Sequence, residues 1–135
     1  MSAPEGNLTP AQYEIMEIVW NRGRAGATVA EVWQAVSESR SVARTTVLNL
    51  VDRLEKRGWL KRRQRLGSYH YVAAVNREKT AALLAGGFVD DFFGGSASEL
   101  VMSLLGSKRL KADEVERLRR MLRTTHGGKS EEGES

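Results

Sequence analysis

The chain has 135 residues, 41% of them hydrophobic, which allows one or two small domains with modest cores. It has no cysteine, which excludes disulfides, cysteine-ligated zinc and thiol nucleophiles, and no apolar run approaches the roughly 20 residues that cross a membrane. The net charge is +4, but residues 40–65 hold nine Lys or Arg against two acids, a concentration typical of proteins that bind a polyanion.

Two segments near the N-terminus carry strong signals for the start of a helix. Thr9 can cap a helix that has proline at its first position and Gln12 three residues after the cap, which completes a capping box. Thr28 and Glu31 form a second capping box, and each such cap contributes roughly 1 kcal/mol. We therefore expect one helix from residue 10 to the glycines at 23 and 26, and a second from residue 29.

The segment 44–58 predicts an amphipathic helix with two different faces. Val47, Leu50, Val51 and Leu54 recur at i, i+3, i+4 and i+7, which is the spacing of one buried stripe. We expect the helix to end at Gly58, after two basic residues that suit a helix C-terminus. The opposite face is mostly polar and carries Arg44, Thr45, Leu48, Asn49 and Asp52.

Residues 59–75 change to the pattern of a β-hairpin. Two β-prone runs, 59–65 and 69–72, flank a turn at residues 66–68, and several basic side chains lie near the tip. A two-stranded hairpin is marginally stable alone, so its aromatic and aliphatic residues must pack on the helices. A helix with a short polar face followed by a basic hairpin is the arrangement of a winged DNA-binding domain.

Residues 76–123 predict three short helices with many large apolar side chains. A unit this small cannot bury those side chains in a core of its own, so we expect them to interdigitate in a symmetric dimer. Packing of these helices on the chain's own N-terminal domain is the alternative. The expected interface comprises Leu84, Phe88, Phe92, Phe93, Leu100, Val101, Leu104, Leu105, Leu118 and Leu122.

Together these elements predict a mainly α protein with a small β-hairpin wing. We expect a winged helix-turn-helix domain at residues 1–75 and a C-terminal helical dimerisation domain at 76–123. Gly, Ser and Glu dominate residues 124–135, which predicts a disordered acidic tail. The first seven residues lack the basic and apolar regions of a secretion signal, and a chain without cysteine suits a reducing compartment, so we expect a cytoplasmic protein.

The predicted helix and hairpin supply the residue types that recognise duplex DNA. Asn49 can pair bidentately with adenine and Leu48 can contact a thymine methyl group, whereas arginines of the wing hold phosphates. Thr46 can instead cap the helix, and Arg53 and Arg57 can instead pair with carboxylates. We expect DNA contacts from Arg44, Thr45, Thr46, Leu48, Asn49 and Arg53 of the helix and from Arg62, Arg63 and Arg65 of the wing.

The sequence carries no convincing catalytic or metal site. Its only histidines, His70 and His126, have no acid or nucleophile partner in the local pattern. Asp90 and Asp91 are adjacent, but neighbours in a helix point about 100° apart, so a solvated helix face is the simpler interpretation. We therefore expect no enzymatic activity, no metal ion and no cofactor.

Several short motifs occur in a defined order between Leu8 and Arg123. The most specific is Thr46-Val47 with Leu50-Val51-x-Arg53-Leu54-x-Lys56-x-Gly58. Others are Leu8-Thr9, Glu14-Ile15-Met16, Val19-Trp20, Thr28-Val29-Ala30-Glu31-Val32, Tyr69-x-Tyr71, Phe93-Gly94-Gly95 and Leu100-Val101. In order and spacing they resemble the penicillinase-repressor family of winged-helix regulators, the BlaI/MecI group.

This resemblance implies a dimeric repressor on a palindromic operator, with one winged domain on each half-site and the C-terminal helices joining the subunits. In characterised members a membrane sensor metalloprotease responds to β-lactam, and the repressor is then cut in its C-terminal domain. The Asn-Phe bond cut in those relatives corresponds to Ser103–Leu104, so the residues at the cleavage position differ. Copper-responsive relatives use cysteine pairs, which this sequence lacks.

We therefore predict a homodimeric, sequence-specific transcriptional repressor that binds operator DNA, is released by proteolysis and does not insert into membranes. One alternative is a regulator of the multidrug-resistance-regulator type, released from DNA by a small molecule. Another is a winged-helix module that binds protein and leaves its basic face solvated. Absence of operator binding together with a retained protein partner would indicate the second alternative.

Overall fold

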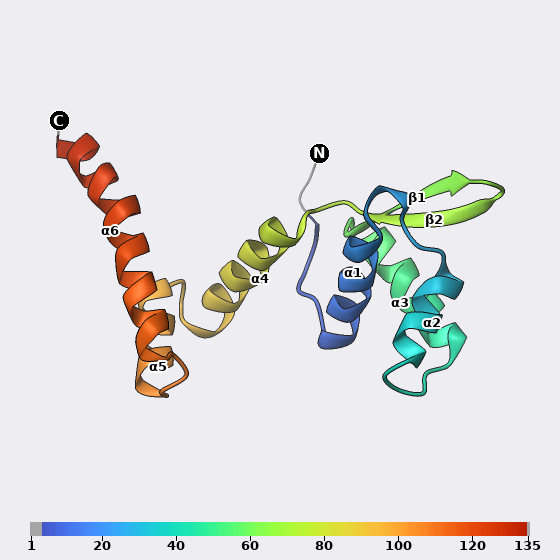
Figure 1. The fold of residues 1–135 in the computed structure, drawn as a ribbon, viewed down its shortest axis with the longest axis horizontal. Helices are drawn as coiled ribbons and strands as arrows, with labels where there is room; N and C mark the ends of the chain where they lie inside the picture. Colours follow the sequence, from blue (N-terminus) through green and yellow to red (C-terminus); the bar gives the residue numbers. More distant parts are fainter. Residues whose placement is uncertain (1–3, 135) are drawn as a thin grey trace. The chain divides into compact units, whose positions relative to one another are not determined.

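The computed structural model describes residues 4–134, with side chains through Thr124, and it divides into two compact units. Unit 1 (Met1–Gly87) holds three α-helices, a hairpin and the start of a fourth helix, and unit 2 (Phe88–Ser135) holds the remaining helices (Figure 1). This order of elements confirms the predicted mainly α fold with a winged helix-turn-helix region followed by a helical region.

Three helices form most of unit 1: α1 (Pro10–Arg22), α2 (Val29–Ser37) and α3 (Arg44–Lys56). Both predicted capping boxes are present. Thr9 Oγ1 accepts from the Gln12 N–H at 3.2 Å while the Thr9 N–H donates to Gln12 Oε1 at 2.9 Å. Thr28 and Glu31 form the equivalent pair at 3.1 and 2.9 Å. A short 3-10 helix, η1 (Gly23–Ala25), follows α1.

The helices of unit 1 enclose a continuous apolar core. Its larger aliphatic side chains each contribute about 1.5–3 kcal/mol through burial. Two indole groups fasten distant segments to it: Trp20 Nε1 donates to the Val75 carbonyl at 2.9 Å, and Trp59 Nε1 to the Glu5 carbonyl at 3.1 Å. The core cluster consists of Ile15, Met16, Val19, Ala27, Val32, Val36, Val47, Val51, Leu54, Trp59, Leu60 and Tyr71.

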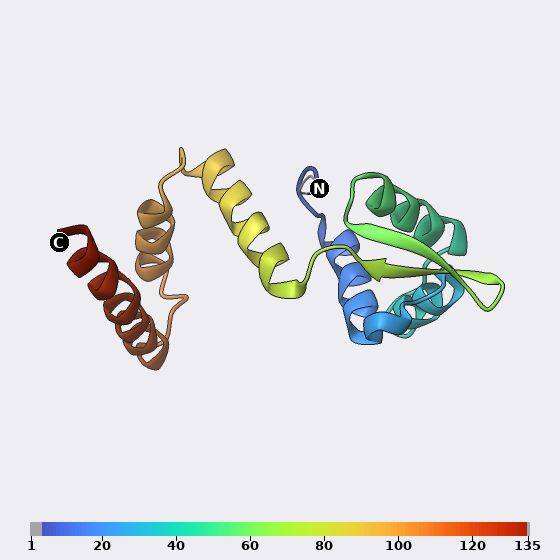
Figure 2. The same cartoon turned by 90° about the horizontal axis from the view of Figure 1, so that it is seen from above.

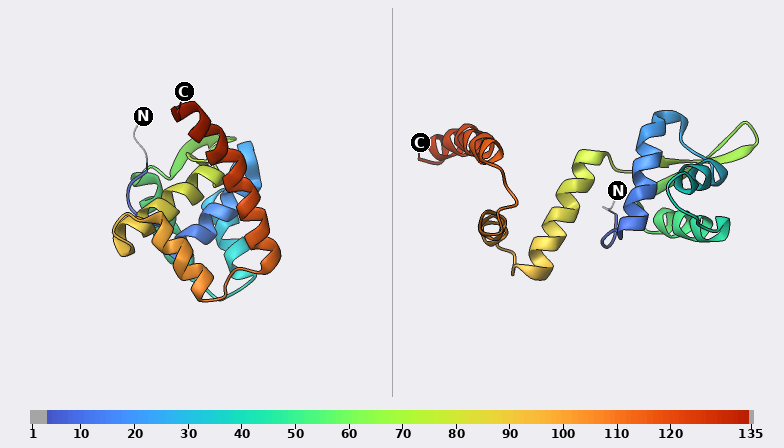
Figure 3. Two further views of the ribbon diagram at one scale, coloured as in Figure 1. Left: turned by 90° about the vertical axis from the view of Figure 1, so that its left-hand side faces the viewer. Right: turned by 60° about the horizontal axis from the view of Figure 1, so that its bottom comes forward.

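The predicted hairpin consists of β1 (Leu60–Arg65) and β2 (Ser68–Ala73), paired antiparallel. Its turn contains only Leu66 and Gly67, whose φ values of +53° and +80° are both positive, as a type I′ turn requires. Ser68, expected in the turn, begins β2, since two residues suffice to reverse the chain. The hairpin runs beside the helices of unit 1 and its tip projects past them (Figures 2 and 3).

A short backbone pairing attaches the α1–α2 connection to β2. The Ala27 N–H donates to the Tyr71 carbonyl at 3.0 Å, and the Tyr71 N–H donates to the Ala27 carbonyl at 2.8 Å. Gly26 is needed beside this bridge because a Cβ there would lie 2.6 Å from the Tyr71 carbonyl oxygen, and its φ is +70°. The bridge therefore holds η1 against the hairpin.

Arg57 fastens the N-terminal segment to the end of α3. Its guanidinium donates to the carbonyl of Glu5 at 3.0 and 2.8 Å and also to that of Asn7. The Glu5 N–H donates back to the Arg57 carbonyl at 3.0 Å. The salt bridge considered for Arg57 is thus replaced by backbone contacts about 50 residues away in sequence, which no local pattern could indicate.

The fourth helix, α4 (Arg77–Phe92), crosses the boundary between the units, which falls after Gly87. Our expected boundary at 75/76 lies at the start of this helix. The first part of α4 belongs to unit 1 because Thr80 is fully buried there and Leu83 and Leu84 pack against its core. Leu84, which we expected at a dimer interface, is thus half-buried against the core of its own chain.

Unit 2 continues with two further helices, α5 (Ala97–Gly106) and α6 (Ala112–Glu134). Gly94 and Gly95, with φ values of +57° and +84°, end α4 as expected, and Ser96 caps α5 by accepting from the Glu99 N–H at 3.3 Å.

The last helix is longer than the sequence suggested. It continues to Glu134, beyond residue 123, where we expected the last helix to end; Ser135 lies outside the described residues. No proline follows Pro10 in the sequence, so every later position keeps the N–H that a helix needs to propagate.

Candidate nucleic-acid interface

The exposed face of α3 carries the residues that we expect to contact base edges. Val47, Val51 and Leu54 are buried on the other side, and this fixes the rotation of the helix about its axis. Arg44, Thr45, Thr46 and Asn49 are exposed. Leu48 is 46% exposed although it is apolar, so packing within the chain does not account for it.

The first turn of α3 has no side-chain cap. Its N-cap residue is Ala43, and Thr46 lies inside the helix, where its own N–H donates to the Ala43 carbonyl at 3.1 Å. The capping role considered for Thr46 is therefore wrong. Its hydroxyl, the neighbouring Thr45 and the Arg44 guanidinium surround a positively polarised helix end, which is suited to a DNA phosphate or base edge.

The later part of α3 mixes paired and unpaired charges. Asp52 forms an ion pair with Lys56 at 2.9 Å, one turn further along the same helix. Arg53 is exposed, and among residues 4–124 it forms no salt bridge, so the pairing considered for it is absent from this structure. An unpaired arginine on this side of the helix is suited to a phosphate contact.

The strand register separates the arginines of the wing onto two faces. Residues directly opposite each other in an antiparallel pair lie on the same face, and successive residues alternate. Arg62 lies opposite Tyr71, whereas Arg63 lies opposite His70 and Arg65 opposite Ser68. The three arginines that we grouped as one set therefore point in two directions.

Arg62 lies on the face that packs toward α3. Its Nε is 3.8 Å from Glu55 Oε2, and its guanidinium carbon lies 4.4 Å from the centre of the Tyr69 ring. Tyr71, on the same face, is buried, and burial raises the pKa of its hydroxyl. Arg62 is thus partly occupied in supporting the wing. The alternation of residues along the strand could not show which face of the hairpin packs toward α3.

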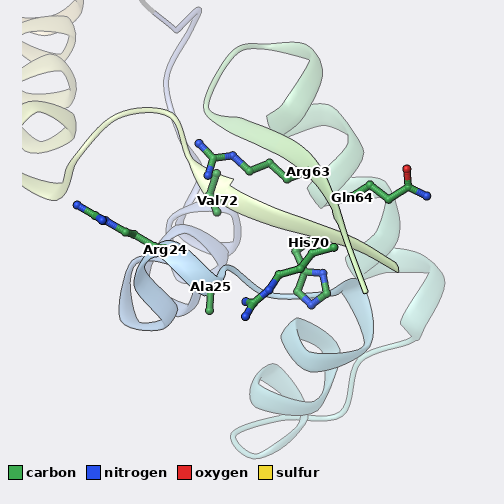
Figure 4. Close-up of a pocket in the computed structure, with 7 residues that line it drawn as sticks. Arg24, Ala25, Arg63, Gln64, His70 and Val72 are labelled. Carbon is green, nitrogen blue, oxygen red and sulfur yellow. The ribbon is translucent and has the colours of Figure 1, made fainter. Parts of the chain in front are cut away.

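Arg63 and Arg65 lie on the opposite face of the hairpin, where they meet a residue that the sequence did not predict as part of the site. They line an open cavity of about 340 Å³ together with Arg24 of η1 and His70 of β2 (Figure 4). Arg24 follows the predicted first helix in a connection that we interpreted only as a helix stop. Its place beside the wing depends on the Ala27–Tyr71 bridge, a contact between residues 44 positions apart.

The predicted dimer residues of unit 2 remain largely uncovered in the single chain. Phe92 is 71% exposed, and Phe88, Val101, Leu105, Leu118 and Leu122 are also exposed. Phe93, Leu100 and Leu104 are half-buried. Phe88 contacts both Phe92 and Phe93, with ring centres 5.0 and 5.8 Å apart. These helices therefore present a broad apolar surface.

Ser103 and Leu104, the position that corresponds to the cleavage site of relatives, lie inside α5. Ser103 is exposed, and its carbonyl accepts from the Ser107 N–H at 3.0 Å. The bond between them is thus part of a hydrogen-bonded helix rather than an extended segment.

Metal-binding clusters are absent from the part of the chain with described side chains: no three His, Asp or Glu residues come together there. No described helix is long and apolar enough to span a bilayer.

Comparison with known proteins gives one consistent result. A family model described as "Penicillinase repressor" matches residues 8–124. The penicillinase repressor of Staphylococcus aureus is 24% identical over 122 residues, covering 90% of this chain and 95% of that protein. The methicillin resistance regulatory protein MecI of Mammaliicoccus sciuri is 24% identical, covering 85% and 92%.

Among solved structures, a similar one is Bacillus licheniformis BlaI in monomeric form with the blaP half-operator. It is 19% identical, with a TM-score of 0.47, and covers 54% of this chain and 87% of that one. Escherichia coli MarR is 22% identical, with a TM-score of 0.43, and covers 87% and 78%.

Proposed function

Because this chain belongs to the penicillinase repressor family of DNA-binding regulators, we propose that it acts as a homodimeric transcriptional repressor on a palindromic operator. One copy of unit 1 reads each half-site, and unit 2 joins the two copies. We place its action in the cytoplasm, where it meets chromosomal DNA.

The exposed face of α3 carries this proposal. A single helix is held by Val47, Val51 and Leu54 so that Asn49 and Leu48 point away from the core. Asn49 offers one donor and one acceptor to adenine in the major groove, and Leu48 offers an apolar contact to a thymine methyl group. Leu48 lies exposed beside Asn49 and Thr45, so an apolar contact and polar contacts are available on the same face.

The wing supplies affinity rather than sequence choice. Arg63 and Arg65 are exposed and have no carboxylate partner among residues 4–124. Contacts of such arginines with phosphates act on any sequence and weaken as salt rises.

Unit 2 brings a second copy of unit 1 to the second half-site by joining the two chains. Its exposed apolar side chains need a cover, and a second copy of the same helices provides one with closed symmetry. Phe92, Val101, Leu105, Leu118 and Leu122 form the centre of the proposed interface. Joining two DNA-binding units in this way raises operator affinity on the order of 10²-fold or more over a single unit.

We further propose that the repressor is released by proteolysis within unit 2, by a membrane sensor metalloprotease. The Ser103–Leu104 bond becomes available when α5 unwinds, because a protease binds its substrate in extended form. A cut there divides the interface and removes the advantage of the second half-site without any ligand on unit 1.

Selection from a random duplex library tests the proposal. We expect the purified chain to enrich a palindrome, and gel shift on that palindrome to show sequence-selective, salt-sensitive binding. Asn49→Ala serves as the reading variant and Asp91→Asn, outside α3 and the wing, as the matched control. Recovery of no common sequence, or equal binding to scrambled duplex, would contradict the proposal.

A further inference from the structure

The cavity beside the wing is lined by no residue of α3, so the proposed base reading by that helix gives it no role. Arg24, Arg63, Arg65 and His70 surround it, and we call these four residues the wing-flank cluster. Figure 4 shows Arg24 and Arg63 extending from the connection and the hairpin on either side of Val72. The cluster lies on the hairpin face opposite the one that holds Arg62 toward Glu55 of α3.

Backbone hydrogen bonds and the strand register bring the residues of this cluster together. The Ala27–Tyr71 bridge, with bonds of 3.0 and 2.8 Å, holds η1 against β2, and Gly26 permits the approach. The strand register then sets Arg63 directly opposite His70. The backbone positions that carry these side chains are therefore fixed before any ligand arrives.

The arginines of the cluster are not neutralised by ion pairs within the described residues. Among residues 4–124, none of its three arginines forms a salt bridge. Glu31 lies close enough to His70 to interact electrostatically, but it already binds Arg22 at 3.4 Å and accepts the Thr28 N–H at 2.9 Å. That backbone hydrogen bond is the main cause that lowers the pKa of the Glu31 carboxyl. Three unpaired arginines around one cavity are suited to phosphate, which guanidinium groups bind bidentately.

We propose that the wing-flank cluster binds backbone phosphates of DNA that flanks the base pairs read by α3. This inference rests on the proposed function. The cluster faces away from α3, so the phosphates it reaches lie beyond the half-site rather than within it. It thus extends the contacted DNA without adding base choice.

Duplex length separates this role from ordinary wing contacts. The selected operator is prepared as a duplex trimmed to the palindrome and as one extended by about 10 base pairs, one helical turn, on each side. Dissociation constants are measured at low and at moderate salt, about 50 and 200 mM, for the wild type, Arg24→Ala, Arg24→Lys and Arg77→Ala. Arg77 is a matched control because it is exposed, pairs with Glu17 at 3.4 Å and lies outside the cluster.

On the extended duplex we expect Arg24→Ala to weaken binding and to reduce the effect of this salt change by about 3.5-fold for each phosphate that the variant no longer neutralises. Arg24→Lys should keep most of the binding, and Arg77→Ala should match the wild type. On the trimmed duplex all four proteins should bind alike. Equal weakening on both duplexes, or no weakening on either, would overturn the proposal.

Free anions provide the second arm. If inorganic pyrophosphate raises the melting temperature of the wild type but not of Arg24→Ala, while duplex length has no effect, the cluster is a small-anion site and the DNA assignment is wrong. If the wild type fails to bind the trimmed palindrome, the proposed function fails instead. In that case the role of the cluster is tested on long non-specific DNA. Weaker binding of Arg24→Ala than of the wild type would support a phosphate contact, and equal binding would contradict it.

Discussion

Unit 1 and unit 2 differ in how much of their apolar surface a single chain covers. In unit 1 each of the first three helices buries aliphatic side chains, with Met16, Val32 and Leu54 fully inaccessible to solvent. In unit 2 the helix α5 buries no side chain, and Phe92 is 71% exposed. Unit 1 has the core of an independent domain, whereas the proposed dimer would give unit 2 comparable burial.

This difference separates stability from association. A substitution inside unit 1 should change the free energy of unfolding at any protein concentration, whereas one on the apolar surface of unit 2 should act through dimer formation. The contrast also matches the roles in the proposed function. The well-packed unit 1 can hold the DNA-contacting face of α3 in place, and loss of the interface in unit 2 would separate the two chains.

The largest expected effect comes from the core of unit 1. Leu54→Ala should lower the free energy of unfolding by about 2–5 kcal/mol, because Leu54 is fully buried on α3 and its removal leaves a cavity. Urea unfolding followed by tryptophan fluorescence measures the change. The same decrease is expected at different protein concentrations, and a decrease below about 1 kcal/mol would show that this core is not close-packed.

A charge on unit 2 should act on association instead. Phe92→Glu should abolish dimer formation at micromolar protein and lower operator affinity on the order of 10²-fold, because each subunit would then bind its half-site independently. Sedimentation equilibrium and gel shift measure the two effects, with Phe92→Leu as the conservative control. A Phe92→Glu protein that remains dimeric would remove Phe92 from the interface.

Within unit 1, the reading face and the wing should respond differently. Asn49→Ala should cost roughly 1–3 kcal/mol and relax base choice at one position of each half-site. Arg63→Ala should weaken all sequences alike and flatten the salt dependence of binding. Competition gel shifts with single-base operator variants distinguish the two patterns. Identical behaviour of both variants would contradict the division between reading and anchoring.

The smallest expected effect concerns Glu31 at the start of α2. The hydrogen bond from the Thr28 N–H lowers the pKa of its carboxyl in the folded state. Its contribution is therefore present above the ordinary carboxyl pKa of about 4.3 and is lost as the pH falls through the lowered value. Glu31→Gln keeps the capping pattern but removes the charge, so it should cost about 0.3–1 kcal/mol at neutral pH.

Unfolding curves at neutral pH and under acid conditions check this prediction. The gap between the wild type and Glu31→Gln should narrow as the pH falls below the ordinary carboxyl range. A gap that stays constant with pH would show that the charge of Glu31 contributes nothing to the stability of unit 1.

Local features of the fold could be predicted from the sequence. The capping boxes at Thr9 and Thr28 and the apolar stripe of α3 each depend on residues within a few helical turns of one another. These patterns could therefore be recognised in the sequence. The hairpin and its glycine-containing turn are local for the same reason.

Non-local contacts could not be predicted in this way. The separation of Arg62 from Arg63 depends on register and on what each face of the hairpin packs against. Arg57 contacts a segment about 50 residues away, and Arg24 reaches the wing through a bridge between distant residues. Leu84 has the same helical spacing as the exposed residues of unit 2, yet it packs on unit 1. Sequence patterns identify the type of each side chain, whereas tertiary packing decides its partner.

The stoichiometry of the operator complex tests the central proposal most directly. Sedimentation velocity of the wild-type chain with the selected palindrome and with a single half-site gives the number of chains on each duplex, and titration gives both affinities. We expect two chains on the palindrome and on the order of 10²-fold tighter binding than to the half-site. One chain on each duplex, with equal affinity, would contradict a repressor that reads through unit 1 and dimerises through unit 2.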